Sequence, residues 1–316
     1  MTINGQNTVL IICGPTASGK SALALDIAGA FGGTIINADS MQVYQELPIL
    51  TARPRPADEA KVPHRLYGIT SIADTFSAGR WQSLAEREIR AALSKGSLPV
   101  VCGGTGLYLK ALMQGLSPIP EIPTKIRARA RQLLAKKGAA WCHNQLAACD
   151  PSTAERLAPN DTQRIARALE VFEATGKPIS DWQATAPNAP DPSWRFSTIL
   201  IAPPRAAMNT AIDQRFDAMI DTGALDEVRL IAGLDPSLPA LKALGVPELR
   251  RHLAGEISLE TASDHSKTAT RKFAKRQMTW FRNQIIADKT IYAQYMESFR
   301  KIIFSFIRNN VLTDSD

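Results

Sequence analysis

The sequence has few cysteines and no long apolar run. Its four cysteines, Cys13, Cys102, Cys142 and Cys149, form no CxxC pair, so a disulfide scaffold is excluded and a reduced, cytoplasmic protein is expected. The early apolar run at residues 9–13 is too short for the core of a secretion signal. No stretch approaches the ~18 apolar residues of a membrane span. We therefore expect no membrane contact.

The composition also lacks repeats and low-complexity tracts. With 45% hydrophobic and 21% charged residues, 19 glycines and 20 prolines, it is ordinary for a globular chain and excludes disordered and collagen-like classes. A length of 316 residues allows about two domains, or one enlarged by an insertion. The chain carries 37 Lys and Arg against 30 Asp and Glu, and its pI is near 9.3. Such a positive field attracts polyanions if the excess is clustered.

Short β-type runs alternate with turns and helical patterns. These runs are residues 8–12, 34–36, 98–102 and 196–202. Alternation of strand and helix predicts a parallel sheet and an α/β fold class. Helical patterns follow at residues 205–222 and in a long helix whose apolar stripe is Ala274, Met278, Phe281 and Ile285.

Two proline-rich passages, residues 117–123 and 187–192, separate a stretch that is predicted to be all-helical from the rest of the chain. Within that stretch, Asn160 or Asp161 can cap a helix that ends at Gly176, and no strand signal is present. The predicted organisation is a core of residues 1–120 and 193–290, an inserted all-helical domain of residues 121–192, and a helical C-terminal tail of residues 291–316.

A glycine-rich loop between a predicted strand and a helix gives the clearest chemical signal. Residues 14–21 fit the pattern GxxxxGK[ST], in which backbone N–H groups surround phosphate oxygens. Lys20 would neutralise charge and Ser21 would bind Mg2+. The strand-loop-helix placement is what phosphate binding at a helix N-terminus requires, and it favours a P-loop NTPase-like sheet core with helices on both faces. The alternative is a plain turn with a solvated lysine. The loop residues are Gly14, Pro15, Thr16, Ala17, Ser18, Gly19, Lys20 and Ser21.

The acid that usually accompanies such a loop in a phosphohydrolase is missing. The strand predicted at residues 98–102 runs into Gly103-Gly104-Thr105-Gly106, without a Walker-B aspartate. Asp39 instead follows the second strand, at the sheet edge where ligands of open α/β folds bind. Asp39 is thus a candidate general base, or else a carboxylate that caps the next turn. Thr105 would face the same crevice, although alone it is a turn residue, and for Arg215 spacing alone favours a solvated arginine.

Cations cluster in two helical segments. Residues 124–137 hold six cations and no acid, and residues 264–282 hold six cations and one acid. This density suits nucleic-acid phosphates, although a solvated helix face can also show it. In the second segment Lys267, Arg271 and Lys275 form one helical stripe. A third helix is predicted at residues 162–174. Its polar side chains could hydrogen-bond base edges, and they are Gln163, Arg164 and Arg167.

Five segments together resemble the tRNA dimethylallyltransferases, or IPP transferases, in order and spacing. They are GPTASGKS (14–21), NADSMQVY (37–44), GGTGLYL (103–109), NDTQRIARALEV (160–171) and TRKFAKRQMTWFR (270–282). The match spans residues 8–283 and leaves the tail uncovered. The resemblance implies transfer of a dimethylallyl group from dimethylallyl diphosphate to N6 of the adenosine on the 3′ side of the anticodon. The tRNAs concerned read codons that begin with U.

The resemblance also implies roles for single residues. The glycine loop would hold the donor's diphosphate, which accounts for the missing ATPase acid because no water has to be activated. Asp39 is implied as the base that accepts the amine proton, and Thr105 as the group that positions the amine or a donor oxygen. Lys20 and Arg215 would balance the pyrophosphate, and Ser21 with Mg2+ would orient it.

The implied tRNA contacts come from several segments. In the family, the adenine is turned out of the anticodon loop into a channel through the core, while the insertion clasps the anticodon stem-loop. A monomer suffices if one insertion clasps one stem-loop. The implied tRNA-binding residues are Asp39, Ser40, Met41, Gln42, Thr105, Arg127, Gln163, Arg164, Ile165, Ala166, Arg167, Arg271 and Lys275.

The chain departs locally from the family pattern, and two other functions remain open. Where relatives commonly have a Gly-Thr-Ala-Lys-Pro turn, this chain has Leu50-Thr51-Ala52-Arg53-Pro54. Gln45, Ala211 and Val246 also depart from the pattern, and we expect none of these departures to touch the proposed base or the glycine loop. An adenylate prenyltransferase that acts on a free nucleotide would not need the basic helical insertion. An ATP-dependent small-molecule kinase or a nucleic-acid-binding ATPase would use the same loop, but the absent Walker-B acid argues against it.

Overall fold

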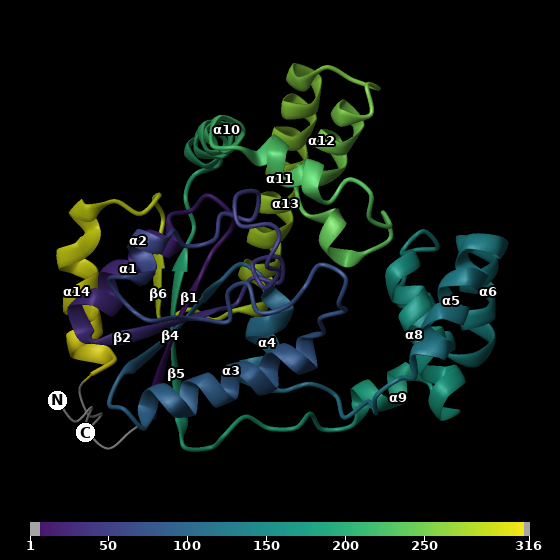
Figure 1. Ribbon diagram of the computed structural model, residues 1–316. Helices are drawn as coiled ribbons and strands as arrows, with labels where there is room; N and C mark the ends of the chain where they lie inside the picture. Colours follow the sequence, from purple (N-terminus) through teal and green to yellow (C-terminus); the bar gives the residue numbers. More distant parts are fainter. Residues whose placement is uncertain (1–6, 313–316) are drawn as a thin grey trace. The chain divides into compact units, whose positions relative to one another are not determined.

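The computed structural model describes residues 7–312, which divide into two compact units (Figure 1). The larger unit contains the chain up to Met113 and again from Asp191 onward, and the smaller unit is Gln114–Pro190. Across residues 7–312, no helix is both long enough and apolar enough to cross a membrane.

A six-stranded parallel sheet forms the centre of the larger unit, with the strand order β3-β2-β4-β1-β5-β6. The strands are β1 (Asn7–Cys13), β2 (Gly33–Asn37), β3 (His64–Arg65), β4 (Leu98–Gly103), β5 (Trp194–Ile201) and β6 (Lys289–Ile291). Cys13 of β1 lies opposite Gly103 and Leu200, so the three central strands end at one level. The predicted parallel sheet is confirmed.

Helices cover both faces of this sheet, as predicted (Figure 1). On β1, Ile11 packs into one core cluster and Ile12 into another, because alternate side chains of a strand point to opposite faces. The first cluster is closed by α3 (Ala78–Leu93), α4 (Gly106–Gln114) and α13 (Leu259–Gln284). The second is closed by α1 (Lys20–Phe31) and α14 (Arg300–Asn310).

A third apolar cluster joins the segment after β2 to helices that follow β5. Its buried residues include Leu50, Phe216 and Leu249. The remaining elements of the larger unit are α2 (Pro56–Glu59), α10 (Arg205–Asp221), α11 (Ala224–Leu230), η1 (Pro239–Lys242), α12 (Val246–Leu253) and η2 (Glu297–Phe299). The predicted helix at 205–222 is therefore present as α10.

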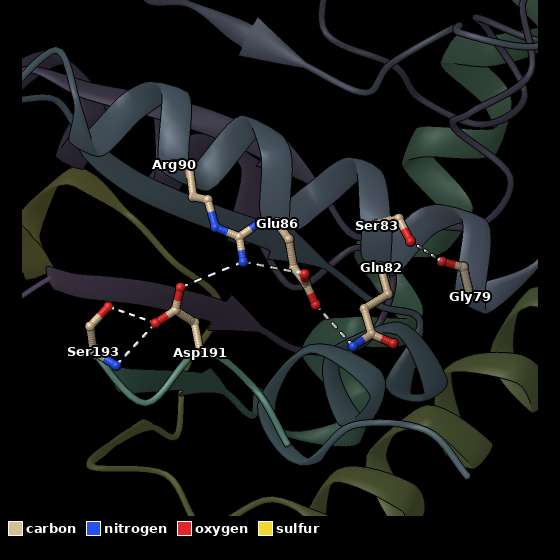
Figure 2. A network of polar contacts seen from close by, with 7 residues as sticks. All are labelled: Gly79, Gln82, Ser83, Glu86, Arg90, Asp191 and Ser193. Carbon is tan, nitrogen blue, oxygen red and sulfur yellow. Dashed lines mark hydrogen bonds and ion pairs between the residues drawn. The ribbon is translucent and has the colours of Figure 1, made fainter. Parts of the chain in front are cut away.

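A network of polar contacts holds the chain at the point where the larger unit resumes, at Asp191 (Figure 2). Arg90 of α3 lies 3.5 Å from a carboxylate oxygen of Asp191 and 3.6 Å from one of Glu86. The other oxygen of Asp191 accepts hydrogen bonds from the N–H and hydroxyl of Ser193, which hold the pKa of Asp191 below its usual value. β5 begins at the next residue, so the network fixes the start of that strand.

The smaller unit is helical, and residues 114–190 contain no strand. Its helices are α5 (Thr124–Lys137), α6 (Ala139–Cys149), α7 (Pro151–Arg156), α8 (Thr162–Thr175) and α9 (Ile179–Ala184). Leu146, Ile165 and Val171 form its fully buried core. Asp161 caps α8 by accepting from the N–H of Arg164, and Gly176 ends the helix at φ 68°, a left-handed conformation that suits glycine.

The tail differs from its prediction. The predicted helix over the tail is wrong for residues 292–296, which are irregular, and α14 begins only at Arg300. Before that segment, residues 289–291 extend the sheet as β6. The part of the predicted tail at residues 313–316 lies outside the described residues. The apolar stripe of α13 also ends one residue early, because Ile285 has extended φ and ψ angles of −118° and 125°.

Candidate active site

The glycine loop joins β1 to the N-terminus of α1. Gly19 precedes the helix with φ 90° and provides no side-chain cap. Among the described residues, no acceptor is bonded to the N–H groups of Gly19 and Lys20. Ala17 has φ 61°, an uncommon left-handed value for a residue with a Cβ. The loop thus presents unpaired N–H groups at the positive end of a helix, where an anion is stabilised.

This loop forms one wall of a cavity of about 500 Å³. Residues 16–22 line it from one side, Asp39 and Gln42 from the segment after β2, and Arg215 from α10. The hydroxyl of Ser18 is buried and has no hydrogen-bond partner among the described residues. The predicted glycine loop, base and arginine are therefore brought together in a space of the size usual for small-molecule sites.

Two cations and one carboxylate set the electrostatics of the cavity. Burial lowers the pKa of the Lys20 ammonium, and the negative charge of Asp39 opposes this shift. Burial also lowers the pKa of the Arg215 guanidinium, again against the attraction of Asp39. Lys20 donates to the carbonyl of Pro15 at 3.3 Å, and Arg215 donates to the hydroxyl of Thr16. Arg215 is thus held at the glycine loop rather than solvated.

Asp39 lines the cavity, and one of its two carboxylate oxygens is held in a turn. Its Oδ1 accepts from the N–H of Met41 at 2.9 Å, while its own N–H donates to Asn37 Oδ1 at 2.8 Å. Within residues 7–312 no donor is bonded to Oδ2. The capping role and the base role are therefore compatible, since they use different oxygens.

Thr105 ties the ends of two strands together. Its Oγ1 accepts from the N–H of Ser40 at 2.9 Å and donates to the Ser40 hydroxyl at 3.2 Å. Its N–H donates to the carbonyl of Ala38 at 3.1 Å. A Cβ on Gly103 would lie 2.2 Å from the Ala38 backbone, so this close approach requires glycine. Thr105 lies beside Ser40, next to the base, and is not itself part of the cavity wall.

Gln42 lines the cavity, and its side chain supports a neighbouring turn. Its amide donates to the carbonyls of Thr51 and Ala52 at 2.8 and 2.9 Å. The same turn is held from α11 by Glu227, whose carboxylate accepts from the N–H groups of Ile49 and Leu50. Burial raises the pKa of Glu227, and these hydrogen bonds oppose the shift.

Comparison with known proteins gives the family. The family model described as IPP transferase matches residues 42–284, which is well over half of the chain. The chain belongs to the IPP transferase family. It is 55% identical over 283 residues to a tRNA dimethylallyltransferase of Rhodospirillum centenum, with 89% of this chain and 90% of the relative covered. The resemblance seen in the five segments is therefore confirmed.

Two solved structures support the same assignment. A tRNA isopentenylpyrophosphate transferase from Bacillus halodurans matches with a TM-score of 0.69 at 29% identity, covering 96% of each chain. A eukaryotic dimethylallyltransferase described as acting on tRNA matches with a TM-score of 0.80 at 26% identity, covering 98% of this chain and 81% of the other. The cavity of this IPP transferase reaches beyond the family match, because the glycine loop lies before residue 42.

Several cavity residues were not predicted. Thr51, Ala52 and Ala211 line the cavity. Of these three, Ala211 is a departure from the family pattern, so one departure lines the same cavity as the proposed base and the glycine loop. Gln214 of α10 and Gln294 of the tail also line it.

Gln277 is the most informative residue that sequence reasoning missed. It is buried on α13, where its Oε1 accepts from the N–H of Thr16 at 2.9 Å and its Nε2 donates to the carbonyl of Gly104 at 2.8 Å. It thus bridges the glycine loop and the loop after β4. A signal was present, since Gln277 is a polar residue next to Ala274 and Met278 in an apolar helical stripe.

The predicted basic stripe of α13 is partly neutralised. Lys267 lies 2.6 Å from a carboxylate oxygen of Asp217, and Arg271 lies 2.6 Å from one of Asp213, both on α10. Lys275 is exposed. Two of the three stripe cations therefore hold α10 to α13.

In the smaller unit, the predicted tRNA-binding residues fall into two groups. Gln163 and Arg164 are exposed on α8, and Arg164 also pairs with Asp161 at 2.9 Å. Ile165 and Ala166 are buried, so their side chains pack inside the unit. Two further predicted residues are placed by polar contacts. Arg167 lies 3.4 Å from Glu170, and the Nε of Arg127 on α5 is buried without a partner among the described residues.

Proposed function

We propose that this protein transfers a dimethylallyl group from dimethylallyl diphosphate to N6 of the adenosine on the 3′ side of the anticodon, in tRNAs that read codons beginning with U. The observation that carries the proposal is the cavity that joins the glycine loop, Asp39 and Arg215. The names of the relatives add support, since they are tRNA dimethylallyltransferases.

The donor's diphosphate would lie on the glycine loop. Its oxygens would accept from the unpaired N–H groups of the loop, while Lys20 and Arg215 supply positive charge. Negative charge grows on the diphosphate as the allylic C–O bond breaks. Donors that are already in place stabilise that charge without reorganisation, and partial burial of both cations strengthens their effect.

Mg2+ is the proposed cofactor. The residues fit it, because Ser21 is exposed in the first turn of α1 and lines the same cavity as Asp39, so both oxygen-bearing side chains belong to one site. Mg2+ characteristically keeps waters and binds through few protein oxygens together with substrate phosphates. Ser21 would hold the ion beside the diphosphate, and the ion would supply neutralising charge there.

Asp39 would serve as the general base. The N6–carbon bond forms as the carbon–oxygen bond to diphosphate breaks, and the amine proton passes to the carboxylate. An exocyclic adenine amine is a weak nucleophile, so removal of its proton during attack raises its reactivity. The oxygen that remains outside the Met41 turn is the one available for this step.

The acceptor would be the anticodon stem-loop of a tRNA. Gln163 and Arg164 expose polar groups suited to a nucleic acid, and Lys275 does so on α13. A single-stranded loop offers its adenine at low cost, because little pairing has to be broken. A monomer acting in the cytoplasm, without membrane contact, completes the proposal.

The proposal is tested by incubating the protein with Mg2+, radiolabelled dimethylallyl diphosphate and either unmodified tRNA or AMP, with ATP hydrolysis as the control. Label released from tRNA as N6-dimethylallyl-adenosine is the expected result. Label in AMP alone would indicate a free-nucleotide prenyltransferase. ATP turnover without transfer would refute prenyl transfer altogether.

The base is tested by Asp39→Asn. Asparagine keeps an oxygen that can accept from the Met41 N–H, so the turn should persist while the base is lost. Turnover should fall by about 100-fold or more, with donor affinity little changed. Near-normal turnover of Asp39→Asn would show that Asp39 only caps the turn.

A further inference from the structure

The chain returns to the glycine loop after α13. β6 pairs in parallel with β5, with Ile199 opposite Lys289 and Ile201 opposite Ile291. Because the strands are parallel, the chain leaves β6 at the edge where β1 enters the glycine loop. The irregular segment that follows is thereby directed at the candidate donor site.

Tyr295 contacts the glycine loop directly. Its N–H donates to the carbonyl of Ser18 at 3.2 Å. A Cβ on Gly19 would lie 2.9 Å from the Cβ of Tyr295, so the two backbones approach as closely as a glycine permits. Tyr295 is buried at this contact, and the tail segment therefore supports the loop on which the diphosphate is proposed to lie.

A carboxylate on α1 anchors the same segment. The hydroxyl of Tyr295 donates to Asp26 Oδ2 at 2.5 Å, and Arg300 lies 2.7 Å from Asp26 Oδ1. Burial and the Asp26 hydrogen bond raise the pKa of Tyr295 to about 12, so its hydroxyl remains a donor at neutral pH. Asp26 thus joins two residues of the tail to the helix that begins at the glycine loop.

Gln294 extends from this anchored segment into the cavity wall. Gln294 is half-buried, and within residues 7–312 its side chain has no hydrogen-bond partner. An amide that lines the same cavity as Lys20 and Arg215 offers two N–H donors to an anion. We propose that Gln294 is a donor-binding residue whose side-chain amide binds a diphosphate oxygen, held in place by Tyr295 and Arg300 through Asp26.

This inference rests on the proposed function, but it adds a residue from outside the family match. That match ends at residue 284, before β6 and the segment that holds Gln294. The tail is then part of the donor site rather than an appendage of the core.

Calorimetry with pyrophosphate and Mg2+ tests the contact on the full chain. Gln294→Ala should bind pyrophosphate roughly tenfold more weakly than the unaltered protein, since a hydrogen bond to a charged group is lost. Gln294→Glu should bind still more weakly, because a carboxylate of similar size repels the anion. Tyr292→Ala is the matched control, because Tyr292 is 77% exposed and outside the cavity wall. The affinity of this variant for pyrophosphate should equal that of the unaltered protein.

The outcomes separate this inference from the proposed function. If the unaltered protein binds neither pyrophosphate nor dimethylallyl diphosphate, the donor site itself is refuted. If it binds and Gln294→Ala binds equally well, only the role of Gln294 is overturned. A Glu variant that binds no more weakly than the Ala variant would also overturn direct contact. The KM for tRNA should stay constant in all variants, and a rise would indicate a general structural change instead of donor binding.

Discussion

Gln277 provides a quantitative test of how the candidate site is held. Its side chain is 7% exposed and satisfies two backbone groups that belong to different loops, the N–H of Thr16 and the carbonyl of Gly104. Gln277→Met keeps a similar length and shape but removes both hydrogen bonds. An unpaired buried group costs about 1–3 kcal/mol, and the Thr16 bond is only partly buried. The loss in unfolding free energy should therefore be about 2–4 kcal/mol.

Urea unfolding measures this loss as a lower midpoint at an unchanged slope. Gln284→Met, at the exposed end of the same helix, is the control and should stay within about 0.5 kcal/mol of the unaltered protein. The KM for the donor should also rise in Gln277→Met, because the glycine loop loses one of its supports. If Gln277→Met is as stable as the control, the bridge between the two loops contributes nothing and the reasoning is wrong.

A double-mutant cycle with Gly104→Ala isolates the bridge itself. A Cβ on Gly104 would lie 2.4 Å from the Nε2 of Gln277, so the alanine displaces that amide and breaks the same hydrogen bond. The two substitutions should therefore be less than additive, with a coupling of about 0.5–3 kcal/mol. Strict additivity would mean that Gly104 is required for another reason.

Three further outcomes follow from buried groups. Glu227→Gln turns an amide N–H2 toward one of the N–H donors of Ile49 and Leu50, so unfolding free energy should fall by about 1–3 kcal/mol, and an unchanged urea midpoint would contradict this. Burial raises the pKa of both Cys13 and Cys102 from 9.0 to about 12, so neither should react with iodoacetamide at pH 8 until the protein unfolds. Unfolded thiols lose their protons near pH 9 and the folded ones do not, so the free energy of unfolding should fall as pH rises from about 9 toward 12. The fall with pH should be less steep in Cys102→Ala. An equal slope in the variant and the unaltered protein would refute the assignment.

The central sheet was predictable because its signal is local. In β1, Leu10, Ile11 and Ile12 are fully buried, and a short apolar run bounded by turns is typical of a strand covered on both faces. β3 and β6 carry no such signal, since each is only two or three residues long and lies at an edge of the sheet. Their pairing is decided by where the chain is brought, which no local pattern contains.

The candidate site divides in the same way. The glycine loop and Asp39 have sequence signals because each follows a strand at the carboxyl edge of the sheet. The cavity contributions of Ala211 and Gln294 come from segments brought there by tertiary packing. The density of cations along the sequence did not predict which of them are neutralised, since the carboxylate that pairs with Arg271 lies on another helix, 58 residues away.

The glycine loop is fixed from three sides before any ligand arrives. Gln277 of α13 accepts from the Thr16 N–H, Arg215 of α10 donates to the Thr16 hydroxyl, and Tyr295 of the tail donates to the Ser18 carbonyl. These three bonds use groups of Thr16 and Ser18, and they leave the N–H groups of Gly19 and Lys20 unpaired among the described residues. The supports therefore hold the backbone without occupying the donors that an anion needs. A site organised in this way stabilises a departing diphosphate without spending binding energy on ordering the loop.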